Sequence, residues 1–370
     1  MINLGHFSTS YTVAREKFLK AAESVELPVH SISHDLLGPN NEVLAVDAVH
    51  VGDPEATRLI IVISGTHGVE GLTGSACQSA WLSQLQQTAL PDDVAVLLIH
   101  AINPYGVAWH RRVNEDNVDL NRNFISHDGS GICNPYYAQV HEFMIPTAYD
   151  GEERVTTDLA LAEIRNELGE DVFQIATLGQ SSHPDGFYYS GDKPVWSNLV
   201  LRKLLDTYAL KRKTVSVIDL HTGLGAYGYG LVGIANDPGT PELQWARDWY
   251  GEAMTTFVEV GQLFGYPDYS AYTDGMLICG IRKMLPDASV ISGGIEFGTY
   301  GPDEIQAAER SDAWLYAHGS NAPQETKEAI RRDLLEVYQP PKTDWQEMVL
   351  TRAGQVMRQT VNGIANLPLR

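Results

Sequence analysis

Basic residues are scarce in this sequence, and their scarcity excludes whole classes of partner. The chain of 370 residues has 26 Lys and Arg against 47 Asp and Glu, which gives a formal net charge of −21. So acidic a protein argues against a nucleic acid or an anionic membrane as the partner, because both carry negative charge. A bound cation and a few arginines can still create one positive pocket within an acidic protein.

Cysteines and long apolar runs are scarce as well. The three cysteines, Cys77, Cys133 and Cys279, are widely spaced, which fits a reducing compartment better than a disulfide framework. The amino-terminal residues lack a basic stretch followed by an apolar one, so we expect no signal peptide. No apolar run reaches the ~18 residues that a membrane-spanning helix needs. We therefore expect a cytoplasmic protein.

Short apolar runs alternate with helical patterns along most of the chain. This alternation predicts an α/β fold, in which a doubly wound, mixed but largely parallel sheet is flanked by helices. The predicted strands are 43–51, 59–63, 94–102, 214–220, 230–234 and 289–297. The predicted helices are 11–24, 71–87, 158–168, 193–208, 242–260, 303–318, 324–338 and 344–362.

No internal repeat, low-complexity tract or clear linker divides the sequence. We expect a single α/β domain over residues 1–370. Residues 125–196 contain few strand patterns, so we expect either an inserted subregion or a set of loops that frames the functional site. Residues 324–370 are expected to form C-terminal helices that cover one face of the sheet.

The segment from Ser64 to Gly71, Ser-Gly-Thr-His-Gly-Val-Glu-Gly, carries the strongest chemical signal. It places His67 and Glu70 three residues apart, directly after a buried apolar strand. Open α/β sheets position their sites at the carboxyl ends of such strands. A histidine and a glutamate there would supply two of the three protein ligands that a catalytic zinc needs.

A second segment follows the predicted strand 94–102. It concentrates arginines and asparagines in a loop: Arg111, Arg112, Asn121, Arg122 and Asn123. Guanidinium groups offer planar, paired donors that suit a carboxylate or an oxyanion. The alternative is a solvated loop with surface ion pairs to its own acidic residues, which are Glu115, Asp116 and Asp119.

Two further polar side chains lie in or at the end of apolar strands. Alternation along strand 214–220 places Asp219 and His221 on one face, so Asp219 is positioned to orient a ligand imidazole. Glu296 interrupts the apolar strand 289–297, and a buried carboxylate is costly unless it is paired or functional. The alternatives are a histidine satisfied by the backbone and an edge-strand glutamate that faces water.

Together, and in this order, the four segments resemble the zinc carboxypeptidase (M14-type) metallopeptidase superfamily. They look closest to its bacterial DUF2817-like branch, and aspartoacylase and succinylglutamate desuccinylase are more distant relatives. The matching motifs are His67-Gly-Val-Glu70, Arg112 with Val118-Asp-Leu-Asn-Arg-Asn-Phe124, Asp219-Leu-His221 and Glu296-Phe-Gly. The resemblance implies a zinc carboxypeptidase-like (phosphorylase/hydrolase-like) fold.

The resemblance also assigns roles to individual residues. It implies that His67, Glu70 and His221 bind one Zn²⁺ per chain. Glu296 matches the general base, and Arg112 matches the arginine that holds the oxyanion, with Arg111 as its rival.

For substrate binding, Asn121 and Arg122 match the pair that holds a terminal carboxylate. A substrate-contacting tyrosine is expected before the glutamate, and Tyr272 has the best spacing among three candidates, the others being Tyr266 and Tyr269. His183, in a loop that departs from the digestive enzymes, could reach a substrate or a second metal, or could be a surface histidine.

The function that the resemblance implies is a zinc-dependent hydrolase that cleaves an amide bond adjacent to a free carboxylate. Its substrate would be a small peptide, or an N-acyl amino acid if the protein is a deacylase. A catalytically silent zinc-binding protein on the same scaffold is the other hypothesis, and loss of Glu296 or Arg112 would be its signature. Both residues are present.

Overall fold

A computed structural model describes residues 2–85, 89–129, 131–259, 273 and 275–368. The strands are β1 (Val29–Leu37), β2 (Val43–Val51), β3 (Arg58–Ser64), β4 (Val94–His100), β5 (Thr214–Gly223), β6 (Gly230–Ile234), β7 (Met254–Thr256) and β8 (Ser289–Gly298). The α-helices are α1 (Tyr11–Glu23), α2 (Gly71–Gln84), α3 (Pro104–Trp109), α4 (Tyr137–Met144), α5 (Gly151–Leu168), α6 (Glu170–Ala176), α7 (Trp196–Tyr208), α8 (Pro241–Tyr250), α11 (Leu277–Met284), α12 (Pro302–Ala317), α13 (Gln324–Tyr338) and α14 (Thr343–Ala365).

The eight strands form one mixed sheet in the order β1-β2-β4-β3-β5-β8-β6-β7. Its four central strands, β4, β3, β5 and β8, are mutually parallel. Antiparallel pairing joins β1 to β2, β2 to β4 and β6 to β8. The predicted fold class, a largely parallel mixed sheet flanked by helices, is confirmed.

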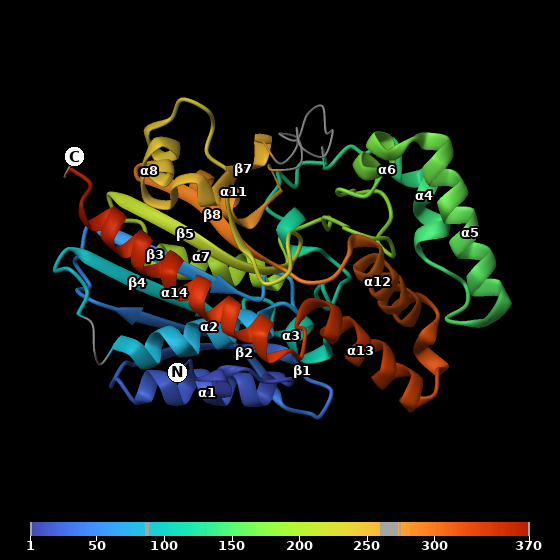
Figure 1. The fold of residues 1–370 in the computed structure, drawn as a ribbon, viewed down its shortest axis with the longest axis horizontal. Coiled ribbons are helices and arrows are strands. Elements are labelled where there is room, and N and C mark those ends of the chain that lie inside the picture. Colours follow the sequence, from blue (N-terminus) through green and yellow to red (C-terminus); the bar gives the residue numbers. More distant parts are fainter. Residues whose placement is uncertain (1, 86–88, 130, 260–272, 274, 369–370) are drawn as a thin grey trace.

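Helices cover both faces of the sheet, and the side-chain alternation of the central strands explains why (Figure 1). In β3, Ile60 and Val62 pack into one hydrophobic cluster with residues of α1, α2, α8 and α14. Leu59, Ile61 and Ile63 pack into a second cluster with residues of α7 and α11. The apolar run of β3, residues 59–63, is thus buried on both faces, as parallel strands in α/β proteins are.

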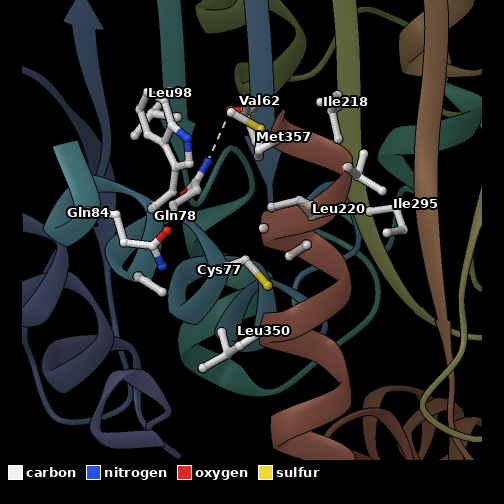
Figure 2. Close-up of a pocket in the computed structure, with 15 residues that line it drawn as sticks. Val62, Cys77, Gln78, Gln84, Leu98, Ile218, Leu220, Ile295, Leu350 and Met357 are labelled. Atoms are coloured by element: carbon white, nitrogen blue, oxygen red, sulfur yellow. Dashed lines mark hydrogen bonds between the residues drawn. The ribbon is translucent and has the colours of Figure 1, made fainter. Parts of the chain in front are cut away.

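A small cavity lies in the first of these clusters, between α2, α14 and the sheet. Figure 2 shows Cys77 and Gln78 facing Leu350 and Met357 across it. The cavity measures about 20 Å³, which is close to the space of a single water molecule. The Gln78 amide donates to the main-chain oxygens of two strands. This gap belongs to core packing and is far too small for a substrate.

The strand order places a topological switch point between β3 and β5. The chain continues from β3 through α2 to β4 on one side, whereas β5 pairs with β3 on the other side. Ligands of open α/β sheets bind outside the carboxyl ends of the strands at such a point. His67 follows β3 and His221 lies near the end of β5, so both fall at this edge.

Residues 125–196 contain the helices α4, α5 and α6, which lie to one side of the sheet (Figure 1). Leu161 and Phe173 belong to a separate hydrophobic cluster there. Arg310 of α12 donates to the main-chain oxygens of Phe143 and Met144. These bonds join the helical subregion to the helix that follows the last strand of the sheet.

The predicted helix 242–260 is wrong at 251–256, whereas 257–259 are again helical. The helix α8 ends at Tyr250, because Gly251 adopts a left-handed backbone with φ of 59°. The chain then forms β7, which pairs with β6 at the edge of the sheet. Strands β1 and β7 and the helices α3, α4, α6 and α11 were not predicted, while the other predicted strands and helices correspond to observed elements.

Among the helices that the structure describes, none combines the length and the apolar character needed to cross a membrane.

Candidate metal centre

The turn that carries His67 and Glu70 is held tightly between β3 and α2. A side chain at Gly68 would collide with the backbone of Gly106, since an added Cβ would lie only 2.3 Å from its Cα. Only glycine permits this approach of two main chains. The tight turn places both His67 and Glu70 in the interior, where each is almost completely buried.

The second histidine comes from the adjacent strand. His221 lies in β5, and its Nε2 is 2.8 Å from Oδ2 of Asp219. The other oxygen of Asp219 accepts a hydrogen bond of 2.8 Å from the hydroxyl of Thr66. Asp219 and His221 therefore share a face of β5 as the sequence predicts, and Asp219 fixes the orientation of the imidazole ring.

The predicted ligands converge on one another. One ligand atom from each of His67, Glu70 and His221 lies within 4.8 Å of the other two. The Nδ1 of His67 is 2.8 Å from one oxygen of Glu70, and the Nδ1 of His221 is 3.0 Å from the other. This is the only group of three metal-ligating side chains with that spacing among the described residues.

The charges at this centre are strongly coupled. Burial by itself raises the pKa of Glu70, but the charges of His67 and His221 and their hydrogen bonds lower that pKa overall. Burial likewise lowers the pKa of His221, and Asp219 and Glu70 more than reverse this, so the pKa rises well above its usual value. The buried carboxylates of Asp219 and Glu70 thus stabilise a positive charge at the position of His221.

The donor set fits a zinc ion. Two imidazoles and one carboxylate are a common ligand set of catalytic zinc. Metal-binding histidines usually donate their second ring nitrogen to a carboxylate or carbonyl. Here the Nε2 of His221 meets Asp219 at 2.8 Å, and the Nε2 of His67 lies 3.3 Å from Asp119. His67 and His221 each turn the other ring nitrogen, Nδ1, toward Glu70.

Glu296 stands next to the second histidine. The pairing of β5 with β8 sets His221 directly beside Glu296. One Glu296 oxygen accepts a hydrogen bond of 3.1 Å from the main-chain N–H of Leu224. Burial and the charge of Glu70 raise the pKa of Glu296 to about 7, against a smaller opposing effect of His221. A carboxyl with this pKa gains and loses a proton readily near neutral pH.

Arg112 is the arginine that reaches the centre. Its Nη2 lies 2.8 Å from the Nε2 of His67, and its Nη1 lies 3.4 Å from Glu70. Its Nε donates to Asp119 at 3.3 Å. A guanidinium can only donate, so the Nε2 of His67 accepts from Arg112 in this geometry. A proton on that nitrogen would turn it toward Asp119, which lies 3.3 Å away.

Arg111 points elsewhere, although it is adjacent in sequence. Its Nε donates to Asp312 at 3.0 Å and its Nη2 to Asn117 at 3.0 Å. The main-chain oxygens of Arg111 and Arg112 accept hydrogen bonds from the N–H groups of Val69 and Gly68, each 2.9 Å long. The arginine segment thus braces the turn between the first two ligands, and Arg112 is favoured over Arg111 as the group facing the centre.

The predicted carboxylate-binding pair is engaged in structural contacts. The side-chain oxygen of Asn121 accepts a hydrogen bond of 2.9 Å from the N–H of Leu277, at the start of α11. Arg122 is buried, and its guanidinium donates to the main-chain oxygens of Leu178 and Asn121. These bonds use Nε and Nη1 of Arg122. The role of the pair in substrate binding stays a prediction.

Two predictions from the sequence remain, one for a substrate-contacting tyrosine and one for His183. Tyr266, Tyr269 and Tyr272 lie outside the described residues. His183 packs against His141, with ring centroids 4.2 Å apart and ring planes tilted by 36°, and its Nδ1 lies 2.7 Å from the hydroxyl of Ser182. It is not part of the metal-ligating group.

Four residues at the centre were missed from the sequence. Asp119 is fully buried and contacts both His67 and Arg112, although the sequence offered a surface ion pair as one interpretation. The other three are Tyr188, Glu309 and Tyr338. The composition of the loop after β4 hinted at Asp119, whereas the helical patterns around Glu309 and Tyr338 carried no such signal.

Comparison with protein families gives one match that spans nearly the whole chain. The family described as "Protein of unknown function (DUF2817)" matches residues 7–352. The chain belongs to the DUF2817 family. The resemblance to the DUF2817-like branch is therefore confirmed, and the match includes the His67–Glu70 turn, the arginine loop and the strands β5 and β8.

Solved structures similar to this DUF2817 protein share little sequence with it. Thrombin activatable fibrinolysis inhibitor is 13% identical, with a TM-score of 0.45, over 88% of this chain and 74% of that one. Succinylglutamate desuccinylase from Chromobacterium violaceum is 13% identical, with a TM-score of 0.36, over 91% and 76%. The murein-tripeptide amidase MpaA from Escherichia coli O157 is 15% identical, with a TM-score of 0.36, over 87% and 97%. No curated protein matches the chain.

Proposed function

We propose that this protein is a zinc-dependent hydrolase that cleaves an amide bond adjacent to a free carboxylate, as a carboxypeptidase does. The observation that carries the proposal is the convergence of His67, Glu70 and His221, whose ligand atoms lie within 4.8 Å of one another. Glu296 stands beside His221 on the neighbouring strand, and Arg112 contacts His67 and Glu70. A Lewis acid, a base and an oxyanion donor together are what amide hydrolysis needs.

The two histidines and Glu70 would hold the zinc. His67 and His221 would bind through Nδ1, the ring nitrogen that each turns toward Glu70. Asp219 is placed to keep the ring proton of His221 on Nε2, and Asp119 would accept the proton of His67 once its Nε2 carries one. When bound in such a site, zinc lowers the pKa of water and polarises a carbonyl group. The carboxylates behind the histidines would raise the basicity of the ligand nitrogens.

Glu296 would act as the general base. Its pKa of about 7 suits a group that takes a proton from the attacking water and passes it to the leaving nitrogen. The hydrogen bond from the N–H of Leu224 holds one of its oxygens, which leaves the other for the proton. Arg112 would donate to the negative charge that develops on the carbonyl oxygen.

The substrate would carry a free carboxylate. Asn121, Arg122 and Tyr272 are the residues that we propose for its recognition, in line with the motif they match. Both a short peptide and an N-acyl amino acid present this carboxylate next to an amide bond. The arginine and asparagine loop is therefore compatible with either substrate class.

The test combines metal analysis with a hydrolysis screen. Protein purified without added metal or chelator is analysed for its elements and assayed against N-acyl amino acids and short peptides with free C-termini. We expect about one zinc per chain and cleavage that a chelator abolishes. Zinc without cleavage of any compound would favour the silent binding protein, and no metal even after zinc is offered would refute the ligand assignment.

A further inference from the structure

Two helices that follow the last strand of the sheet contribute a buried group beside Arg112. Glu309 of α12 is 6% exposed, and Tyr338 at the end of α13 is 2% exposed. The ring of Tyr338 packs in a hydrophobic cluster with Val69, which lies in the turn between His67 and Glu70, and with Leu72, which follows that turn. This cluster brings the C-terminal part of the chain to the metal centre.

The hydroxyl of Tyr338 lies between two opposite charges. It donates a hydrogen bond of 2.6 Å to Oε1 of Glu309. The same hydroxyl accepts from Nη1 of Arg112, at 3.4 Å. Oε1 of Glu309 is itself 3.7 Å from that Nη1, which is too long for a direct hydrogen bond.

A second tyrosine satisfies the other side of the carboxylate. Tyr188 donates to Oε2 of Glu309 at 3.0 Å, and its ring lies 5.3 Å from the guanidinium carbon of Arg112. Both oxygens of Glu309 are therefore occupied by phenol hydroxyls. A buried carboxylate without such donors would form a short, charge-assisted pair with the nearest guanidinium.

We propose that Tyr338 is a positioning residue that keeps Arg112 and Glu309 apart, so that the guanidinium stays available to a bound anion. The proposal rests on the role of Arg112 in the proposed function. With the hydroxyl in place, Glu309 balances the charge of Arg112 at a distance. Without it, Oε1 loses its donor, and Arg112 moves onto Glu309 and away from Glu70.

The first experiment needs no metal and no substrate. Crystal structures of the metal-free wild-type protein and of Tyr338→Phe give the distance between Nη1 of Arg112 and Oε1 of Glu309. We expect it to shorten from 3.7 Å to about 2.9 Å, the length of a charge-assisted hydrogen bond. In the double variant Tyr338→Phe/Glu309→Gln the guanidinium should return to its wild-type place. An unchanged guanidinium in Tyr338→Phe overturns the proposal.

The second experiment measures anion binding at the centre. Protein loaded with Co²⁺ is titrated with inorganic phosphate, and the visible absorption of the cobalt reports binding. Tyr338→Phe should weaken phosphate binding about tenfold, and the added Glu309→Gln change should bring the affinity back to within about threefold of wild type. Simple structural damage would make the double variant weaker than the single one, and that result also overturns the proposal.

A buried tyrosine elsewhere provides the matched control. The hydroxyl of Tyr250 bonds to Thr360 at 2.7 Å, in the packing between α8 and α14. Tyr250→Phe removes a buried hydroxyl just as Tyr338→Phe does, and it should leave phosphate affinity unchanged. If the wild-type protein binds no Co²⁺, the proposed function fails, and the metal-free distance between Arg112 and Glu309 still decides the positioning role.

Discussion

His221 and Glu296 are direct neighbours on two parallel strands, paired across the β5–β8 ladder. As the proposed ligand and the proposed base, they have a backbone separation set by the sheet spacing of about 4.8 Å. Neither side chain depends on a mobile loop for its position. The relation between the proposed ligand and the proposed base is thus set by the pairing of two central strands.

The role of Glu296 is tested by Glu296→Gln. The amide keeps the shape of the side chain but cannot take up a proton, so turnover should fall about 10²–10⁴-fold. Zinc content should stay at the wild-type level, because Glu296 is not among the proposed ligands. Steady-state kinetics and elemental analysis of the same preparation check both parts, and an unaltered rate would remove Glu296 from the role of base.

Loss of one histidine ligand should release the metal. His221→Ala leaves only His67 and Glu70, so zinc affinity should fall by more than the roughly 10–100-fold that loss of an outer hydrogen bond costs. His183→Ala is the matched control, since His183 pairs with His141 instead. Competition with a chromogenic chelator gives both affinities. Equal zinc retention in the two variants would contradict the ligand assignment.

Buried His100 should make stability depend on pH. Burial lowers its pKa from 6.5 to about 4, so the unfolded chain takes up this proton at a higher pH than the folded protein does. The stability that the neutral ring contributes is therefore complete above pH 6.5 and is lost progressively as the pH falls toward 4.

His100→Gln isolates this contribution. Between pH 7.5 and 5.5, the wild-type free energy of unfolding should fall by about 1 kcal/mol more than that of the variant. Urea unfolding at the two pH values measures the difference. An identical loss in both proteins would mean that His100 does not titrate in this range.

Two glycines in α14 should respond oppositely to alanine. A Cβ at Gly354 would meet only the end of the Arg358 side chain, at 3.4 Å, whereas one at Gly363 would lie 2.5 Å from the Trp249 ring. Gly354→Ala should raise the free energy of unfolding by about 0.5–1 kcal/mol. Gly363→Ala should lower it by about 1–3 kcal/mol through overpacking. Urea denaturation compares them, and equal effects would contradict the packing described around this helix.

The sequence was most informative where a single short segment contained both a secondary-structure element and the polar side chains of the candidate site. The apolar run of β3 followed by His67 and Glu70 predicted a strand, a turn and two candidate ligands, and the structure brings these two side chains together. Strand alternation also predicted that Asp219 and His221 share a face. In these cases the period of the backbone alone determines where the side chains point.

Sequence reasoning failed where position depends on packing between distant segments. Glu309 reads as one more charged residue of an amphipathic helix, and only the packing of α12 and α13 brings it to Tyr188 and Tyr338. β1 was missed for a related reason, because a half-exposed edge strand has a weak hydrophobic pattern. No local period encodes either arrangement.

The proposed ligands lie far apart along the chain, since His221 is 151 residues beyond Glu70. His67 and Glu70 follow β3, whereas His221 lies in β5, and β5 pairs with β3 on one side and with β8 on the other. The three side chains therefore meet only when these strands associate. If the proposed ligand set is right, metal affinity arises together with the folded sheet, and unfolding of the sheet would release the ion.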